Sequence, residues 1–438
     1  SCVEETEPTE DMKSQLLSVE EIAERYRIDG EWWGIYGDDQ LNRLVEQALE
    51  NNIDLARAAI DINLALYRAN LLGEELVPGF SGGLDASVKK NIKDGGPSTR
   101  TFGSSLGVSY EIDLWSRLAD AASAQEWEYR ATTEDSASTR LALINSVVDV
   151  YYQLVYLSEA IAVTQESIRH YEEISTLTAV KYRLGRVDSV EPAQAKQSLL
   201  STRNELIDLQ TQQKAAEQTL RNLLNIAPME PLALVYPSML HLSIPDVDLN
   251  IPLSVLANRP DLRAAEFRLQ NTFLDQKATE KSWYPSITLG AAISTSSDKV
   301  RTAFDVPFAS GNISIALPFL QWHKVRWNIR ISEAEFESAK LDFQQSLTTA
   351  LSEVDDYYYC YRQARETLEN IREKYIYDLQ IRDYYDFRYN QGVDELSDWL
   401  DALNTVTVSK RSLLNNRYRV IQYENNIYKA MAGRYNAI

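Results

Sequence analysis

The apolar residues of this chain follow two different periods, and stretches with a helical period dominate. From His323 to Ala432 apolar positions recur at alternating spacings of four and three, with no proline and a single glycine, Gly392. This spacing is typical of a helix that packs lengthwise on other helices. About 69 residues precede Gly392, which corresponds to roughly 100 Å of helix. The pattern therefore predicts a long helical hairpin that turns at Gly392.

Two pairs of short segments change to a period of two, which predicts strands. The first pair, Phe80–Val88 and Leu106–Ile112, is joined by a polar loop, and the second pair is Ile287–Ile293 and Ile313–Leu317. Each predicted strand has about ten to twelve residues, the length that crosses a bilayer when tilted. Two soluble hairpins with one buried face are the alternative. Four membrane strands are too few to close a barrel and cannot leave open edges in lipid, so several chains would be needed.

These elements occur twice at a nearly constant offset. Asp54 and Asp261 are 261 − 54 = 207 positions apart, Gly185 and Gly392 are also 207 apart, and the offset becomes 206 after these glycines. A constant offset over more than a hundred positions indicates a tandem duplication, each copy with a helix, two strands, a long helix, a turn and a helix. The expected segments are 1–37 at the N-terminus, 38–225 as repeat 1 with strands in 78–113 and a hairpin at 116–225, 226–252 as a linker, 253–432 as repeat 2 with strands in 285–318 and a hairpin at 323–432, and 433–438 as a tail.

Charge and motif content argue against several classes of protein. The chain has 44 basic and 64 acidic side chains and a net charge of -20, so nucleic acid is not an expected partner. No run of 18 apolar residues is found, and no transmembrane helix is expected. His170, His241 and His323 lack metal-binding spacing, and neither a phosphate loop nor a nucleophile elbow is present. The sequence therefore predicts neither an enzyme nor a metal or cofactor site.

Cys2 differs in context from Cys360, which lies among tyrosines of a predicted helix. An acidic, polar segment follows Cys2, as in a bacterial lipoprotein after its signal peptide has been removed. Ser1 is interpreted as the residue before the cleavage point. We expect a covalent lipid on Cys2, and an exposed tail thiol is the alternative.

Several motifs resemble those of the outer membrane factors, the TolC-like efflux and secretion channels. The resemblance covers roughly Trp32 to Ala432 and is closest to the lipid-anchored, drug-efflux branch. It implies a mainly α fold with a membrane β-barrel portion: a homotrimer in which a twelve-stranded outer-membrane barrel continues into a long periplasmic α-helical barrel. An equatorial domain would come from Leu224–Ile251 and both terminal segments. The motifs are Ser109–Trp115, Asn258–Arg263, Tyr284–Ile287 and Leu317–Phe319.

The resemblance also implies a function and partners. The chain would be a subunit of a passive exit duct for drugs or other small toxic compounds, anchored in outer-membrane lipid. A periplasmic adaptor and an inner-membrane pump, expected to be of the proton-driven RND type, would supply the energy. Two alternatives stay open: the outer-membrane duct of a type I protein secretion system, and a helical scaffold that transports nothing.

Carried over by position, the residues that constrict the periplasmic entrance are Glu191, Tyr389, Asp398 and Asp401. Asp398 and Asp401 are three positions apart and share one face of a helix. Around a threefold axis each would form a ring of three carboxylates that favours cations. The alternative is a solvated helix start, where acidic residues suit the helix dipole.

The adaptor is expected to contact the two hairpin turns. Asp394 departs from relatives that carry a basic residue at this position to stabilise the closed state. Arg388, Arg183 and Arg186 are candidates to supply the missing charge. The turn residues expected to contact the adaptor are Gly185, Arg186, Val187, Gly392, Val393 and Asp394.

Overall fold

The computed structural model describes residues 18–437, so the predicted lipid site at Cys2 lies outside the described residues. The chain divides into two compact units, and both repeats contribute to each unit. Helices α5 (Arg117–Arg183) and α8 (Trp322–Asn390) are long enough to supply residues to both units. Among the described residues, unit 1 comprises Ala58–Ser136 and Pro260–Leu347, and unit 2 comprises 18–57, Ala137–Arg259 and 348–437.

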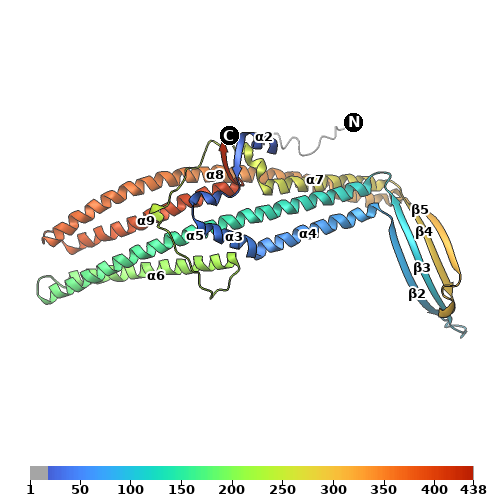
Figure 1. The fold of residues 1–438 in the computed structure, drawn as a ribbon, viewed down its shortest axis with the longest axis horizontal. Helices are drawn as coiled ribbons and strands as arrows, with labels where there is room; N and C mark the ends of the chain where they lie inside the picture. Colours follow the sequence, from blue (N-terminus) through green and yellow to red (C-terminus); the bar gives the residue numbers. More distant parts are fainter. Residues whose placement is uncertain (1–17, 438) are drawn as a thin grey trace. The chain divides into compact units, whose positions relative to one another are not determined.

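Unit 1 contains a four-stranded antiparallel sheet in the order β2-β3-β4-β5 (Figure 1). Both predicted strand pairs are present, and a ladder between β3 and β4 joins the repeats, with Ile112 opposite Ile287. Every residue of the edge strands β2 and β5 is exposed in the isolated chain. Their outer edges can therefore pair with strands of other chains. The strands are β2 (Gly79–Lys89), β3 (Thr99–Ile112), β4 (Ser286–Ser297) and β5 (Pro307–Ala316).

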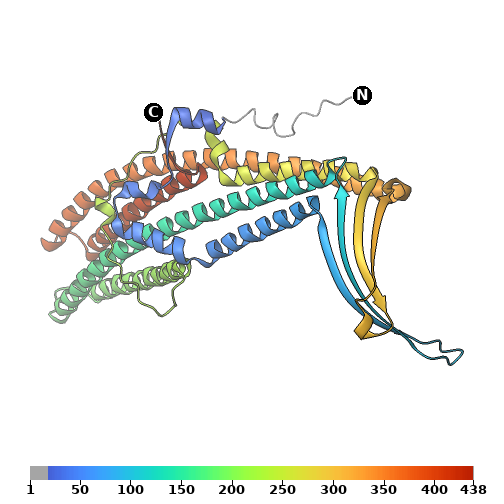
Figure 2. The ribbon, with the colours of Figure 1, turned by 45° about the vertical axis from the view of Figure 1, so that its right-hand side comes forward.

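Equivalent helices of the two repeats lead into the first strand of each pair (Figure 2). The Trp115 indole Nε1 donates to the Pro285 carbonyl at 3.0 Å, and its ring stacks on Tyr284 at 4.8 Å. These contacts tie the end of β3 in repeat 1 to the start of β4 in repeat 2. The helical elements are α4 (Ile53–Gly73) with η2 (Glu74–Leu76), α7 (Pro260–Glu280) with η5 (Lys281–Trp283), η6 (Val300–Thr302) and η7 (Pro318–Gln321).

The helices of unit 1 pack lengthwise, as their apolar spacing predicts. Leu269 of α7 is fully buried against Phe336 and Phe343 of α8. On the α5 side of α7, the Arg268 guanidinium lies 2.5 Å from an Asp135 carboxylate oxygen. An apolar seam on one side and an ion pair on the other thus hold α7 between the two long helices.

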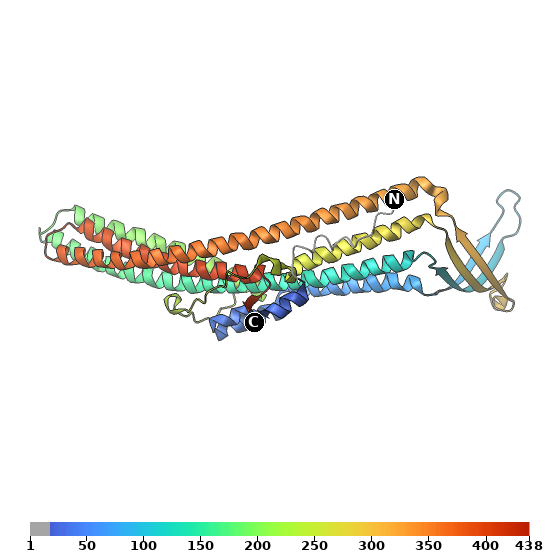
Figure 3. The same cartoon turned by 90° about the horizontal axis from the view of Figure 1, so that it is seen from above.

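Unit 2 contains the two hairpin turns, where α5 continues into α6 (Val190–Leu224) and α8 into α9 (Leu396–Ala430) (Figure 3). The turns have the same geometry, because the backbone amides of Arg186 and Val393 donate at 2.9 Å to carbonyls five residues earlier. Gly185 and Gly392 have φ values of +67° and +70°. This left-handed conformation at a helix end favours glycine, which has no Cβ. The predicted turns at both glycines are confirmed.

Unit 2 also contains a small sheet made of both ends of the described chain. Strand β1 (Tyr26–Asp29) pairs antiparallel with β6 (Arg434–Ala437). The sequence analysis missed both strands, because four residues are too few to establish a period of two. Nearby elements are α2 (Val19–Arg25), η1 (Trp32–Tyr36), α3 (Asp39–Asn51), η3 (Met239–His241) and η4 (Leu253–Asn258).

Each repeat was predicted to begin with one helix, and this prediction is wrong for repeat 1, which has two helices, α3 and α4, with a break at Asn52. The Asn52 side chain accepts from the Leu55 amide and donates to the Leu223 carbonyl, each at 3.1 Å. Asparagine is favoured at helix N-termini for this bond to the backbone. It therefore ends α3 and begins α4 without glycine or proline.

The sequence has no run of 18 apolar residues, but mean hydropathy is a less strict criterion. Among the described residues, α5 holds an 18-residue window apolar enough to cross a membrane by composition. However, 56% of that window is buried inside the structure. Core helices of soluble proteins meet the same criterion, so the window is weak support for a membrane span.

Candidate functional site: the hairpin turns

Close to the turns, the two hairpins of unit 2 share one apolar core. It includes Tyr171 of α5, Leu199 of α6, Tyr389 of α8, and Leu396 and Leu400 of α9, all buried. Each hairpin thus contributes both of its helices to the contact. Because the core joins the two repeats, the position of one turn depends on the position of the other.

Tyr389 is the polar link within this core. Its side chain is 6% exposed, and its hydroxyl donates to Glu191 Oε2 at 3.3 Å. Lys181 Nζ donates to the same hydroxyl at 3.3 Å and lies 4.7 Å from the ring centroid. Burial, followed by the nearby Glu191 carboxylate, raises the pKa of Tyr389 to about 12. The structure therefore brings together two of the four predicted entrance residues, Tyr389 and Glu191.

Sequence analysis missed two members of this cluster, Trp399 and Lys181. Trp399 stacks on Tyr389 at 4.8 Å and meets the edge of His170 at 6.0 Å. The duplication held a signal for Lys181, because 388 − 181 = 207 makes it the repeat equivalent of Arg388. No comparable signal existed for Trp399, since the repeat equivalent of this residue is an alanine, Ala193.

Asp398 and Asp401 lie on the exposed face at the start of α9, while Trp399, Leu400 and Ala402 between and after them are buried. Within residues 18–437 neither aspartate side chain forms an ion pair or a hydrogen bond, so the structure does not join them to Tyr389 or Glu191. Two unpaired carboxylates on one helix face attract cations, and equivalent copies around an axis strengthen the effect.

Asp394, where the resemblance led us to expect a basic residue, is paired within its own turn. The Arg388 Nε and Nη2 atoms donate to its two carboxylate oxygens at 2.6 and 2.9 Å. These hydrogen bonds hold the pKa of Asp394 below its ordinary value. Arg388, one of the three candidate arginines, is thus paired with Asp394 inside the α8–α9 hairpin.

The remaining predicted turn residues form the surface of the two turns. Gly185, Arg186 and Gly392 are exposed, and Val187 is half-buried. Val393 is 59% exposed, as an apolar side chain at the very end of the hairpin. Exposed apolar side chains at both turns suit contact with another protein.

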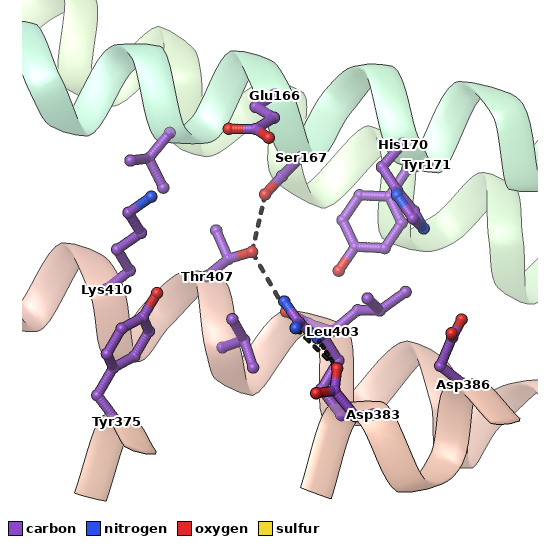
Figure 4. A pocket seen from close by; sticks show the side chains of 13 residues that line it. Glu166, Ser167, His170, Tyr171, Tyr375, Asp383, Asp386, Leu403, Thr407 and Lys410 are labelled. Carbon is purple, nitrogen blue, oxygen red and sulfur yellow. Dashed lines mark hydrogen bonds and ion pairs between the residues drawn. The ribbon is translucent and has the colours of Figure 1, made fainter. Parts of the chain in front are cut away.

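Farther from the turns, a pocket of about 340 Å³ separates α5 from α8 and α9 (Figure 4). Ser167 and Thr407 bridge its two sides through their hydroxyls at 2.7 Å. The Tyr171 hydroxyl, which is buried, has no hydrogen-bond partner within residues 18–437. The two hairpins are thus packed tightly close to the turns. Farther from the turns, polar contacts join them across the pocket.

The duplication, the two unpaired edges of the four-stranded sheet and the two long helical hairpins agree with the fold that the resemblance implies. Residues 44–225 and 251–433 match the family model described as outer membrane efflux protein, and the chain belongs to this family.

Relatives and solved structures agree with this assignment. The chain is 49% identical to "Toxin and drug export protein A" of Aggregatibacter actinomycetemcomitans, over 95% of this chain and 91% of that protein. It is 26% identical to the "Cation efflux system protein CusC" of Escherichia coli strain K12, over 94% and 90% of the two chains. The Campylobacter jejuni CmeC outer membrane channel has the same fold, with a TM-score of 0.84 and 23% identity over 93% of this chain and 88% of that one. The protein is thus an efflux channel component of the bacterial outer membrane and not an enzyme.

Proposed function

We propose that the chain is one of three identical subunits of an outer-membrane exit duct for drugs or other small toxic compounds. The exposed edges of β2 and β5 support this assembly, because one chain cannot close its own sheet. Three chains supply twelve strands in a closed ring. Solute passes through the duct passively, a proposal supported by the absence of a nucleotide-binding phosphate loop from the sequence.

The entrance of the duct is gated at the hairpin turns. The observation that carries this proposal is that Asp398 and Asp401 are exposed on α9, where their side chains form no ion pair or hydrogen bond within residues 18–437. They follow Tyr389, whose partly buried hydroxyl bonds to Glu191, in the same hairpin. Rings of carboxylates narrow the path and favour cations. The Tyr389–Glu191 bond ties the α8–α9 hairpin to the α5–α6 hairpin, so breaking it removes a polar link between them and leaves their shared apolar core.

The test of the gate is a double change of Asp398 and Asp401 to Ala, measured as single-channel currents in a planar bilayer. Removing six carboxylates from a trimer lowers the preference for cations over anions and alters conductance. The matched control changes Glu173 and Asp208, exposed acidic residues of α5 and α6, to Ala. This control removes the same charge elsewhere on unit 2. If both doubles conduct alike, Asp398 and Asp401 do not line the constriction.

The partners are a periplasmic adaptor that engages the two turns and an inner-membrane pump of the proton-driven RND type. Exposed Val393 and Arg186 offer the adaptor apolar and charged contacts. Photo-crosslinking from position 393, compared with an exposed position of unit 1 such as Tyr67, would identify the adaptor.

A lipid on Cys2 would add membrane attachment, and mass spectrometry of the purified protein tests that modification.

The substrate class rests on the 49% identical relative, whose name joins toxin and drug export. That name also favours a second candidate, the outer-membrane duct of a type I protein secretion system. Deleting the gene and measuring drug susceptibility together with the proteins released into the medium separates the two. Increased susceptibility with an unchanged set of released proteins supports drug efflux. Unchanged susceptibility with a loss of released proteins supports secretion.

A further inference from the structure

Glu424 of α9 is a carboxyl group enclosed inside unit 2. Its side chain has no exposed surface, and the Tyr428 hydroxyl one turn later donates to Oε1 at 3.1 Å. No group within residues 18–437 forms a hydrogen bond with the other oxygen, Oε2. A buried carboxylate with one oxygen that lacks a hydrogen bond raises the free energy of the folded state, because its charge is neither solvated nor paired. A neutral carboxylic acid, which can also donate, suits this place better.

Two tyrosine hydroxyls in the same region are also buried without a hydrogen-bond partner in the described part of the chain, those of Tyr36 and Tyr152. Their rings meet edge to face at 5.1 Å. Burial raises the pKa of both hydroxyls. The charge of Glu424 is the next cause for Tyr36, and for Tyr152 it follows the charges of Asp38 and Tyr151, so both hydroxyls lie within the field of this carboxyl. A hydroxyl can accept a hydrogen bond from a protonated carboxyl, and it loses that donor when the carboxyl ionises.

The elements around Glu424 are fixed by its neighbour, Asn425. The Trp32 indole of η1 donates to Asn425 Oδ1 at 2.8 Å, and Asn425 Nδ2 donates to the Asn145 carbonyl of α5 at 3.0 Å. Helix α9 is thereby held between η1 and α5.

The basic groups nearby do not neutralise Glu424. Arg365 is paired with Asp246, and no ion pair within the described residues joins Glu424 to Arg365 or Arg434. Burial outweighs their attraction and raises the pKa of Glu424 to about 8. The titratable and charged groups around Glu424 are Tyr428 of α9, Tyr36 of η1, Tyr152 of α5, Tyr361 and Arg365 of α8, Arg434 of β6, and Asp246 of the connecting segment.

We propose that Glu424, together with Tyr36, Tyr152 and Tyr428, forms a buried proton-binding site that fastens α9 to η1 and α5 and loosens when its proton is lost. The ligand is a single proton, and the site lies apart from the hairpin turns. At the equivalent position of repeat 1 the chain has Gln218 (424 − 218 = 206), a neutral residue of the same shape as glutamic acid.

The pH dependence follows from the two states of the carboxyl. In the unfolded chain Glu424 loses its proton near its ordinary pKa of 4.5, whereas the folded chain keeps it up to about pH 8. The unfolded state therefore binds fewer protons in this interval, and stability falls as pH rises through it. Above pH 8 both states are ionised, so this contribution becomes constant.

The test compares thermal unfolding of the full chain and its Glu424→Gln variant between pH 5 and 9.5. The melting temperature of the variant minus that of the native protein should increase from pH 5 to about 8 and then level off. Glu173→Gln, a change at an exposed residue of α5, is the matched control and should give no such trend. A difference that is the same at every pH would overturn the proposal.

A second variant keeps the test decisive if Glu424→Gln does not fold. The Tyr428 hydroxyl favours the ionised carboxylate, so without it the carboxyl keeps its proton to a higher pH. The melting temperature of Tyr428→Phe should therefore go on falling to a higher pH than that of the native protein. Infrared difference spectra with labelled glutamate provide a direct readout, a carbonyl band of protonated carboxylic acid at pH 7 that disappears above pH 8. A native protein without this band at pH 7 contradicts the proposal.

Discussion

At the scale of single residues, the duplication provides a natural comparison for Tyr389. Its repeat equivalent is Tyr182 (389 − 182 = 207), which is 50% exposed, whereas Tyr389 is 6% exposed and bonded to Glu191 and Lys181. The same residue type is thus a surface side chain in one hairpin and a link between hairpins in the other. This difference explains why repeat symmetry alone does not identify the residues that link the two hairpins.

We predict that Tyr389→Phe lowers the free energy of unfolding by about 1 kcal/mol, the net contribution typical of a side-chain hydrogen bond. The change leaves the Glu191 carboxylate without this donor while it keeps the ring stacked on Trp399. Because the bond joins the two hairpins, single-channel recordings should also show longer open periods. Tyr182→Phe is the control and should change stability by less than about 0.5 kcal/mol. Equal effects of the two changes would show that the Tyr389 bond does not hold the hairpins together.

At the scale of elements, the hairpin turns depend on a backbone conformation that only glycine adopts without strain. Gly392→Ala should lower stability by about 1 kcal/mol, because an L-residue at φ +70° brings its Cβ close to the following carbonyl. A Cβ at this position meets no other atom within 4 Å, so crowding does not contribute. Denaturant unfolding measures the loss.

Gly73 of α4 is a suitable control, since a Cβ there also meets nothing within 4 Å but the residue has φ −61°. Gly73→Ala should be neutral or stabilise the chain by up to about 1 kcal/mol, because alanine restricts the unfolded state. A loss at Gly73 as large as that at Gly392 would contradict the account based on backbone conformation.

The elements also show what the sequence could and could not predict. Periodicity, together with the turn glycines, predicted the two hairpins and the four strands of the larger sheet, because each is long enough to repeat its pattern several times. It did not predict the break at Asn52, which depends on a bond to the distant Leu223 carbonyl. Nor did it predict the β1–β6 pairing or the place of Trp399, since tertiary contacts bring those residues together.

At the scale of the whole molecule, assembly can be tested through the two strand edges. With Cys2 and Cys360 replaced by Ser, cysteines introduced at Leu84 in β2 and at Ile313 in β5 lie on opposite edges of the sheet in one chain. Both positions are exposed in the isolated chain, at 79% and 70%. Edge pairing between chains brings β2 of one copy beside β5 of the next, so a scan of alternate residues on each strand should find pairs that cross-link.

We predict that oxidised membranes give cross-linked species up to three chains, about 150 kDa from three copies of 49.9 kDa, and none larger, because a closed ring has no free edge. The control pair is Ser104→Cys with Thr295→Cys, whose hydroxyls are 2.5 Å apart across β3 and β4 of one chain. That pair should cross-link within the chain and migrate as a monomer. A ladder that continues beyond three chains would indicate an open, growing assembly. If the chains with cysteines in β2 and β5 migrate only as monomers, the sheet edges are closed in some way other than by neighbouring copies.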